Sequence, residues 1–501
     1  MFGLEVLLAI SLLILAFLWW WQRSARSYWE KHGVSYISGP PLIGALKEAM
    51  LFRQSFAELF SDLYGKFKND PITGVYFFHK PSLIVRDPEL IKRILVKDFQ
   101  HFVDRGISSD PIYDKIGRDG LFVAKGTQWK NIRNKVSPVF TTGKLKNFFV
   151  LMENVSRVLE QKLSSEIGQQ ESMEYEMKEL ATEFTVDTIA TCAFGVDANC
   201  LINRNAEFNK IVRRSTNFTW RRAIEFTGCF LLPELATIFR FTVLSKEMNE
   251  FLRSTINYVL EERLKSHTKR NDLIDMLIEM RNGQFHRDTL IAQAGSFLFA
   301  GSETSSSAIS FALYELARHP EIQEKLRVEI HAYASKYGGS VQYETFGEME
   351  YLHSVVQEIV RLYPPLPFLD RMCYPSNGEE SYSLEPYHEF SIPKGMPIYI
   401  PIFSIHRDAK YFENPNDFIP ERFTTENPDK VDQNSYLAFG TGPRNCIGLR
   451  FAYIQVKLAL YTIIRDYRIE VCKKTPSRII LGKKSLMLQS DEPLIMNLVK
   501  I

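Results

Sequence analysis

The chain has 501 residues, of which 45% are hydrophobic and 24% charged, a globular composition with enough apolar material for a large core. Its formal net charge of +2 argues against nucleic acid as the main partner, because phosphate-binding proteins usually carry a strong basic excess. Six cysteines are scattered without a C-x-x-C pair or a Cys/His cluster, which argues against a disulfide framework or zinc module and fits a reducing compartment.

The chain begins with an apolar run, GLEVLLAISLLILAFLWWW, from Gly3 to Trp21, whose one charged residue is Glu5. A helix of this length can cross a bilayer core of about 30 Å. A cleaved signal peptide is the alternative, but it requires a basic start and a small-residue cleavage site. We therefore predict a retained membrane anchor over 1–22. Basic residues follow the run, so the positive-inside rule predicts that the rest of the chain faces the cytosol.

A basic and proline-rich hinge is predicted over 23–44, because Pro40-Pro41 favours an extended, stiff connection. No linker or internal repeat interrupts the remainder, which predicts one catalytic domain over 45–501.

The secondary structure of this domain is predicted to be mainly α with a small β portion. ITGVYFF and PSLIVR form a strand pair around a turn, and Asp87-Pro88 begins a helix. Residues from about 129 to 330 carry the 3.6-residue periodicity of helices. Short strands return in MPIYIPIF at 396–403 and in KKSLMLQS at 483–490.

One long helix is predicted over 289–318, with Asp288 as its N-cap and Pro320 after its end. Its centre, AGSETSSS, contains poor helix formers, although apolar periodicity continues on both sides. A flexible Ser/Gly linker is the alternative. A weakened helix centre often serves function, because carbonyl groups released from the helix can bind water or ligand.

The same centre places Ala300, Gly301 and Thr304 close to one face, where the small residues leave space for a flat ligand. Glu303 lies beside that face, and an acid next to an alcohol is a plausible proton relay. The common alternative is that the hydroxyl only bonds to its own helix backbone.

Another predicted helix, YLHSVVQEIVRLYPPLP, carries Glu358 and Arg361 three residues apart, so that they can pair. Apolar neighbours suggest burial, and a buried pair needs a further partner, which Arg422 in IPERF offers.

The stretch FGTGPRNCIGLRFA holds Cys446 between a Gly/Pro-rich turn and an apolar run. A nucleophilic role lacks a nearby base, and a zinc site lacks companion ligands. A cysteine that only fills the core would not require the glycines, Phe439 and Arg444 beside it. A haem thiolate fits best, since a following helix stabilises the anion, Phe439 can shield the sulfur, Arg444 can pair with a propionate and Gly448 lets the backbone pass close to the macrocycle.

The stretch FGTGPRNCIG matches the haem-binding pattern F-x-x-G-x-R-x-C-x-G of the cytochrome P450 family, which the chain resembles over essentially its whole length. AGSET looks like that family's oxygen-activation motif, EIVR matches its Glu-x-x-Arg motif, and WKNIR matches its Trp-x-x-x-Arg pattern. TCAFG, PPLPFLDR and FALYELARHPEIQEKLR most resemble insect microsomal xenobiotic-metabolising members. Ser302 departs from those relatives, which often carry a bulkier apolar residue there.

The resemblance implies a cytochrome P450 fold and a haem-thiolate monooxygenase that holds haem b through Cys446. It assigns catalytic roles to Thr304 and Glu303 and a structural triad to Glu358, Arg361 and Arg422. The implied cofactor contacts besides Cys446 are Trp129, Arg133, Arg371, Arg444, Phe439, Ala300, Gly301 and Gly448. Candidate substrate contacts are Ile107, Phe122, Ala300, Phe368, Leu369 and Leu486.

The resemblance also implies partners and a location. Electrons would come from NADPH through a membrane-bound cytochrome P450 reductase, with cytochrome b5 as a further partner, and the enzyme would lie at the endoplasmic reticulum membrane facing the cytosol. Its substrates would be lipophilic small molecules, either xenobiotics or endogenous lipids and hormones. A basic face for the reductase is expected to include Lys125, Lys130, Arg133, Lys135, Arg450 and Lys457.

The apolar segment 229–239 is equally compatible with a core helix and with insertion into membrane lipid. Two other functions compete with the monooxygenase: a reductase-independent haem-thiolate isomerase or dehydratase, and a non-catalytic haem-binding sensor. Isomerase-type relatives tend to lose the acid–threonine pair, which is intact here as Glu303-Thr304.

Overall fold

The computed structural model describes all residues of the chain except 1, 169, 267–268, 271, 280–286 and 428–430. The described chain divides into two compact units, each built from segments that are discontinuous in sequence. Unit 1 comprises 1–106, 367–405 and 441–443, and unit 2 comprises 107–366, 406–440 and 444–501. The predicted single catalytic domain over 45–501 stays a prediction.

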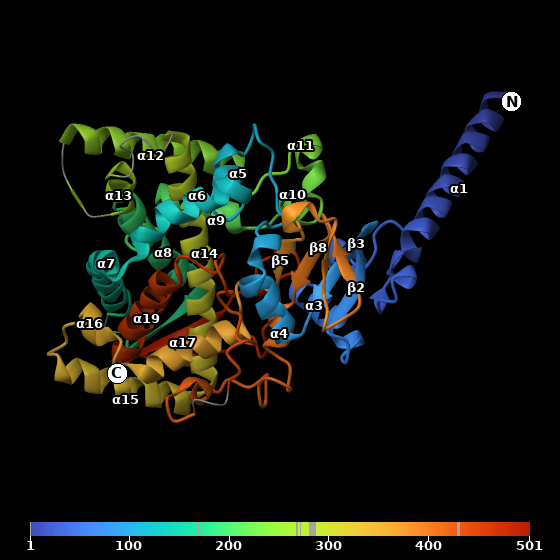
Figure 1. Ribbon diagram of the computed structural model, residues 1–501. Coiled ribbons are helices and arrows are strands. Elements are labelled where there is room, and N and C mark those ends of the chain that lie inside the picture. Colours follow the sequence, from blue (N-terminus) through green and yellow to red (C-terminus); the bar gives the residue numbers. More distant parts are fainter. Residues whose placement is uncertain (1, 169, 267–268, 271, 280–286, 428–430) are drawn as a thin grey trace. The chain divides into compact units, whose positions relative to one another are not determined.

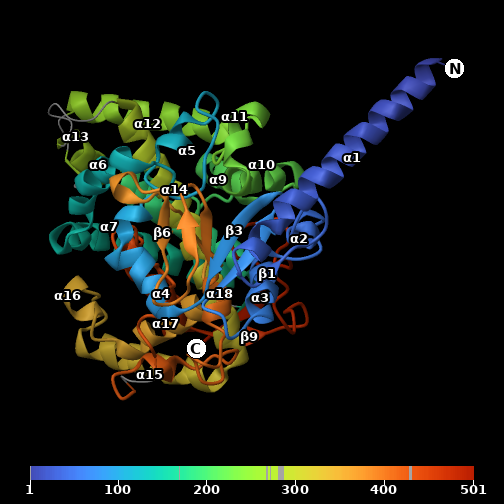
Figure 2. The ribbon, with the colours of Figure 1, turned by 45° about the vertical axis from the view of Figure 1, so that its right-hand side comes forward.

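Unit 1 is built on a five-stranded sheet in the order β1-β2-β3-β8-β5, with a separate β6-β7 hairpin. Pairs β2/β3 and β5/β8 are antiparallel, and pairs β1/β2 and β3/β8 are parallel. In Figure 2, α2 and α3 lie next to the strands of this sheet. Its helices are α1 (Phe2–Lys31), α2 (Lys47–Met50), α3 (Phe56–Lys66), α4 (Pro88–Lys92) and α18 (Ile402–Ile405), and its strands are β1 (Tyr36–Ile37), β2 (Ile72–Phe77), β3 (Lys80–Val85), β5 (Leu369–Met372), β6 (Ser381–Ser383), β7 (Ser391–Pro393) and β8 (Pro397–Ile400). Short 3₁₀ or π segments are η1 (Arg93–Lys97), η2 (Phe99–His101) and η6 (Ser376–Gly378).

Unit 2 is mainly helical, with one antiparallel sheet in the order β4-β10-β9. Its long helix α14 runs past α8, α5 and α19, which pack against it (Figure 1). Its helices are α5 (Lys115–Asp119), α6 (Gly126–Val136), α7 (Thr142–Ile167), α8 (Met177–Ile189), α9 (Glu207–Thr216), α10 (Trp220–Leu231), α11 (Ala236–Phe239), α12 (Lys246–Ser266), α13 (Leu273–Glu279), α14 (Arg287–Arg318), α15 (Pro320–Lys336), α16 (Tyr343–Phe346), α17 (Glu350–Leu362) and α19 (Leu449–Asp466). Its strands are β4 (Ser172–Glu176), β9 (Tyr467–Val471) and β10 (Ile495–Lys500), and its short segments are η3 (Ser137–Phe140), η4 (Ala190–Phe194), η5 (Pro233–Leu235) and η7 (Pro420–Phe423).

The predicted fold class, mainly α with a small β portion, is confirmed. The strand pair is β2/β3, and α4 begins after Asp87, whose carboxylate accepts the Leu90 N–H at 2.9 Å. The run 396–403 contains β8. The predicted strand over 483–490 is wrong: these described residues form no strand, and Ser490 makes an isolated bridge with Leu481 outside the run. Their apolar side chains are buried without a neighbouring strand to pair with, as for Leu486.

The expected membrane span over 1–22 is not supported. Among the residues that the structure describes, no helix combines the length and apolar character that a bilayer crossing requires. Helix α1 also continues past the predicted end at residue 22, as far as Lys31. Its last turns belong to the core of unit 1, because Trp29 is fully buried. Its ring packs on Gly74 so closely that a Cβ there would lie 2.5 Å from a ring carbon.

Candidate functional site

The cysteine loop, residues 439–448, contains Cys446 and leads directly into α19. The Cys446 N–H donates to the Phe439 carbonyl at 2.9 Å, and Gly440 adopts a φ of +68°. Helix α19 begins at Leu449, directly after Gly448. An anion at Cys446 therefore lies near the positive end of an 18-residue helix, which stabilises a thiolate.

Cys446 differs from the other cysteines in its surroundings, since it is exposed. Cys192, Cys200, Cys229 and Cys373 are buried, and burial raises the pKa of each of these thiols, to about 12 for Cys373. A buried thiol with a raised pKa is a poor ligand, because the thiolate is the form that binds metal. Cys446 is thus the cysteine whose position best suits an axial ligand.

Two arginines approach the cysteine loop. Arg133 of α6 donates to the Asn445 carbonyl at 2.9 Å and to Asn445 Oδ1 at 2.8 Å. Burial lowers the pKa of Arg133, and the negative charge of Cys446 opposes that shift. Arg444 donates to the Ala124 carbonyl and lies over the Trp129 ring, 4.9 Å from its centroid.

These residues fit a haem group. An exposed thiol beside a helix N-terminus suits the iron, and the guanidinium groups of Arg133 and Arg444 suit its anionic propionates. Trp129 is only 4% exposed, and its ring packs against the Arg444 guanidinium. The predicted contacts Trp129, Arg133, Phe439, Arg444 and Cys446 are therefore brought together within unit 2.

Helix α14 carries the predicted acid and alcohol in different settings. Ala300 is exposed and Thr304 partly exposed, and the Thr304 hydroxyl donates to the Ala300 carbonyl at 2.6 Å. Gly301 faces α8 instead, because a Cβ there would lie 2.4 Å from Ile189 Cδ1. Glu303 is only 2% exposed. Among the described residues no hydrogen bond joins Glu303 to Thr304, since the two side chains leave the helix about 100° apart.

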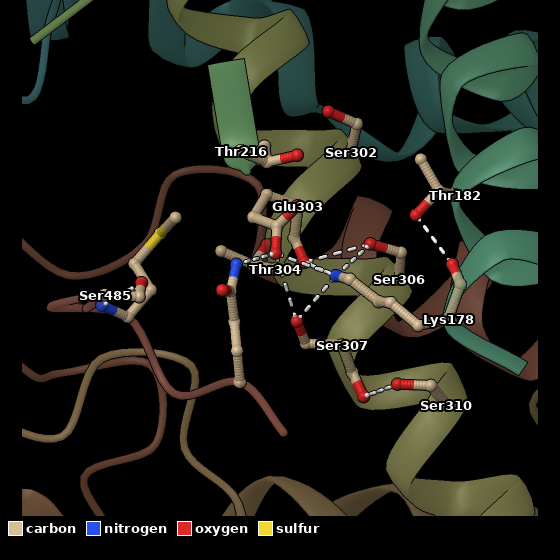
Figure 3. A network of polar contacts seen from close by, with 12 residues as sticks. Lys178, Thr182, Thr216, Ser302, Glu303, Thr304, Ser306, Ser307, Ser310 and Ser485 are labelled. Atoms are coloured by element: carbon tan, nitrogen blue, oxygen red, sulfur yellow. Dashed lines mark hydrogen bonds and ion pairs between the residues drawn. The ribbon is translucent and has the colours of Figure 1, made fainter. Parts of the chain in front are cut away.

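Glu303 belongs to a polar network between α14, α8 and the C-terminal loop (Figure 3). Its Oε1 accepts from Lys178 Nζ at 2.8 Å and from Gln489 Nε2 at 2.7 Å. Lys178 also donates to Ser306 and Ser307. The sequence singled out neither Lys178 nor Gln489, because each is more than a hundred residues from Glu303 and no local pattern marks it.

Helix α14 is continuous through its serine-rich centre, and it starts at Arg287, so Asp288 lies inside the first turn and is not the N-cap. Asp288 instead pairs with Lys115 at 2.5 Å and Arg253 at 2.8 Å, and these hydrogen bonds lower its pKa to about 2. In the centre, Thr185 of α8 donates to the Ser302 carbonyl at 3.2 Å. Side chains of the neighbouring helix thus bond to the weak segment.

The predicted ion-pair residues form one buried cluster. Glu358 and Arg361 of α17 pair at 2.6 Å, and Arg422 of η7 reaches the other Glu358 oxygen at 3.2 Å. Arg361 also donates to the carbonyls of His406 at 2.6 Å and Pro415 at 2.7 Å. The pair is fully buried, and its hydrogen bonds satisfy the charges that burial would otherwise penalise.

The candidate contacts of unit 1 lie around β5. Arg371 is 1% exposed, and its Nη1 donates to the Asp370 carbonyl at 2.7 Å. The Asp370 carboxylate holds Arg105 at 3.0 Å. Phe368 and Leu369 are buried, and the Phe368 ring lies 4.4 Å from that of Phe60.

The remaining substrate candidates lie in unit 2. Ile107 and Leu486 are buried, and the Phe122 ring lies 6.2 Å from that of Phe230 on α10. The segment 229–239 is mixed, because Cys229 is fully buried whereas Phe239 is 60% exposed.

Asp114 is a buried carboxylate that the sequence did not single out. Its Oδ2 accepts from the backbone N–H groups of Val243 at 2.6 Å and Leu244 at 3.1 Å. Its Oδ1 accepts from Gly117 N and from Asn249 Nδ2, both at 3.0 Å. Asp114 therefore connects the 107–122 loop to the segment that leads into α12.

The basic residues expected to form a docking face for a reductase are only partly exposed at the surface. Lys125, Lys130 and Arg450 are exposed, whereas Lys457 is 5% exposed. Lys457 donates to the Phe346 carbonyl at 3.2 Å, and burial lowers its pKa to about 8. Lys457 therefore cannot meet a partner at the surface.

Comparison with known proteins gives consistent matches. The sequence model described as "Cytochrome P450" matches residues 37–497. The chain is 41% identical to "Probable cytochrome P450 6g2" of Drosophila melanogaster, covering 99% of this chain and 98% of that protein. It is 39% identical to "Probable cytochrome P450 6w1" of the same organism, with the same coverage. It is 35% identical to "Cytochrome P450 6j1" of Blattella germanica, covering 95% of this chain and 93% of that protein.

Proposed function

The chain belongs to the cytochrome P450 family and is a P450 monooxygenase, and we propose that it inserts one oxygen atom of dioxygen into lipophilic small molecules. The observation that carries the proposal is the setting of Cys446, an exposed thiol beside the start of α19 with Arg133 and Arg444 around its loop. We propose Cys446 as the axial ligand of haem b.

A haem held by Cys446 would supply the oxygen chemistry, with the cysteine thiolate as its electron-donating ligand. The chain's own residues control charge and protons. Arg133 and Arg444 would neutralise the haem propionates, and Trp129 lies under the Arg444 guanidinium. The Thr304 hydroxyl donates its hydrogen to the Ala300 carbonyl, so its oxygen can accept a hydrogen bond from a donor on the open face of α14. Glu303, whose carboxylate lies on the neighbouring side of α14 that faces α8, is proposed as the acid from which protons pass toward that face.

Electrons are proposed to come from NADPH through a flavoprotein reductase, with Lys125, Lys130 and Arg450 as exposed cations on its docking face. Xenobiotics and endogenous lipids or hormones are the proposed substrate classes. The endoplasmic reticulum location, with the catalytic domain facing the cytosol, stays a prediction from the sequence.

The test is an assay of oxygen uptake by the purified holoenzyme with reductase, NADPH and a panel of lipophilic compounds. The proposal predicts uptake that requires both reductase and NADPH and yields hydroxylated or epoxidised products. Rapid rearrangement of organic peroxides with no oxygen uptake on any compound would contradict it and favour an isomerase. Haem binding with neither reaction would favour a sensor.

A further inference from the structure

The Lys178 side chain crosses from α8 to the serine-rich centre of α14. Its Nζ lies 2.8 Å from Glu303 Oε1, 2.7 Å from Ser306 Oγ and 2.8 Å from Ser307 Oγ (Figure 3). Nζ also lies 3.3 Å from the Glu303 carbonyl oxygen, so four acceptors share the three protons of the ammonium group. The side chain is 28% exposed, so it links a buried carboxylate to the edge of the protein.

The two oxygens of Glu303 have unequal surroundings. Oε1 accepts from Lys178, from Gln489 at 2.7 Å and from Ser307 at 3.4 Å. Oε2 is buried and, within the described part of the chain, has no hydrogen-bond partner. An unpaired buried oxygen is costly, which in a native structure calls for an explanation such as a catalytic role. The free position for a proton is therefore Oε2.

Lys178 is the one cation within ion-pair distance of Glu303 among the described residues. The neighbouring acids are engaged elsewhere: Glu176 accepts the Lys178 and Glu179 N–H groups, and Glu179 pairs with Arg213 at 3.2 Å. The other groups facing Glu303 are the neutral Gln489, Ser306 and Ser307. Without Lys178 the buried carboxylate would have no counter-charge within ion-pair distance in the described part of the chain.

We propose that Lys178 is a positioning residue for proton delivery. It holds Glu303 by Oε1, on the side of α14 that faces α8, and so leaves Oε2 as the oxygen that can take up and release a proton. Gln489 supports the same oxygen from the C-terminal loop. The inference rests on the proposed function, in which Glu303 supplies protons for oxygen cleavage.

The experiment compares the holoenzyme with variants K178M, K178R and E303Q, using reductase, NADPH and one substrate identified by the oxygen-uptake assay. Product formed per NADPH and hydrogen peroxide released are measured. A matched control is K474M, because Lys474 forms an exposed ion pair with Glu174 at 2.5 Å. Absorbance of the ferric haem checks that each variant is loaded equally.

We expect K178M to lower product per NADPH by about tenfold, with matching peroxide release, since protons fail to reach the cleavage step. K178R should recover most of the yield, and K474M should match the unchanged enzyme. In urea unfolding, the K178M/E303Q double variant should be less destabilised than the sum of the two single variants.

The outcomes separate two failures. If E303Q itself leaves product per NADPH unchanged, the proposed role of Glu303 is wrong and this inference falls with it. If E303Q uncouples the reaction while K178M behaves like K474M, only the inference is overturned. A K178M loss with no recovery in K178R also overturns it, because that pattern marks a purely structural role.

Discussion

At the scale of single residues, His406 ties the buried ion-pair cluster to the chain leading into the cysteine loop. Its Nε2 accepts the Leu437 N–H at 2.8 Å, and its Nδ1 contacts the Arg361 carbonyl at 2.9 Å. Since an N–H faces Nε2, the proton of the neutral ring must lie on Nδ1. Burial lowers the pKa of His406 to about 3, so the ring is neutral at physiological pH.

This lowered pKa predicts a stability loss in mild acid. The unfolded chain binds a proton at His406 near pH 6.5 and the folded chain only near pH 3, so the free energy of unfolding falls as pH drops between them. By pH 5 the loss from this residue is about 2 kcal/mol. Urea unfolding of His406→Gln should lack this component, whereas His79→Gln, at an exposed position, should keep it. An identical pH slope in all three proteins would contradict the assignment.

Gly442 in the cysteine loop has no room for a side chain. Its φ is +74°, and a Cβ would stand 1.9 Å from the Leu95 carbonyl oxygen, a backbone atom that cannot rotate away. Gly442→Ala should lower the free energy of unfolding by at least about 2 kcal/mol. Gly143→Ala is the matched control, since nothing lies within 4 Å of a Cβ there, and should change it by less than about 1 kcal/mol. Equal effects in thermal unfolding would show that the loop relaxes.

At the scale of elements, α14 shows what sequence periodicity can and cannot predict. The helix and its end before Pro320 followed from the apolar spacing and the proline. The start was misplaced because Asp288, a good capping residue, is drawn into ion pairs with Lys115 and Arg253. The partner of Glu303 could not be predicted, because Lys178 meets it through the packing of α8 on α14 and not through local spacing.

The carboxylate of Asp114 connects the 107–122 loop to the start of α12, beside a backbone hydrogen bond from Asp110 N to the Phe241 carbonyl at 2.8 Å. In Asp114→Asn an amide N–H₂ replaces one oxygen and faces N–H donors, so about 1–3 kcal/mol of stability is lost. Amide hydrogen exchange of residues 240–249 should become faster. Asp110→Asn is the control, since Asp110 Oδ1 accepts only from Ile112 and Tyr113 of its own turn, and should leave 240–249 unchanged. Unchanged exchange in Asp114→Asn would show that packing alone holds the segment.

At the scale of the whole molecule, the fold class and the cysteine loop were predictable because each has a strong local signal. The pairing of Glu358, Arg361 and Arg422 was predictable from charge spacing within an apolar helix. The division into two units was not, since unit 1 gathers segments hundreds of residues apart. The burial of Lys457 was also not predicted. A lysine is usually exposed, and the sequence does not show which residues pack against it.

The central claim is that Cys446 binds haem iron as a thiolate, and the absorption spectrum of the reduced carbon monoxide complex tests it most directly. The unchanged protein should give the thiolate-type Soret band, and Cys446→Ser should lose that band, because an alcohol oxygen is a far weaker donor than a thiolate. Cys472→Ser is the control, since Cys472 Sγ donates to the Ile495 carbonyl and accepts from the Thr475 hydroxyl, and this variant should keep the band. A thiolate-type band that persists in Cys446→Ser would contradict the account.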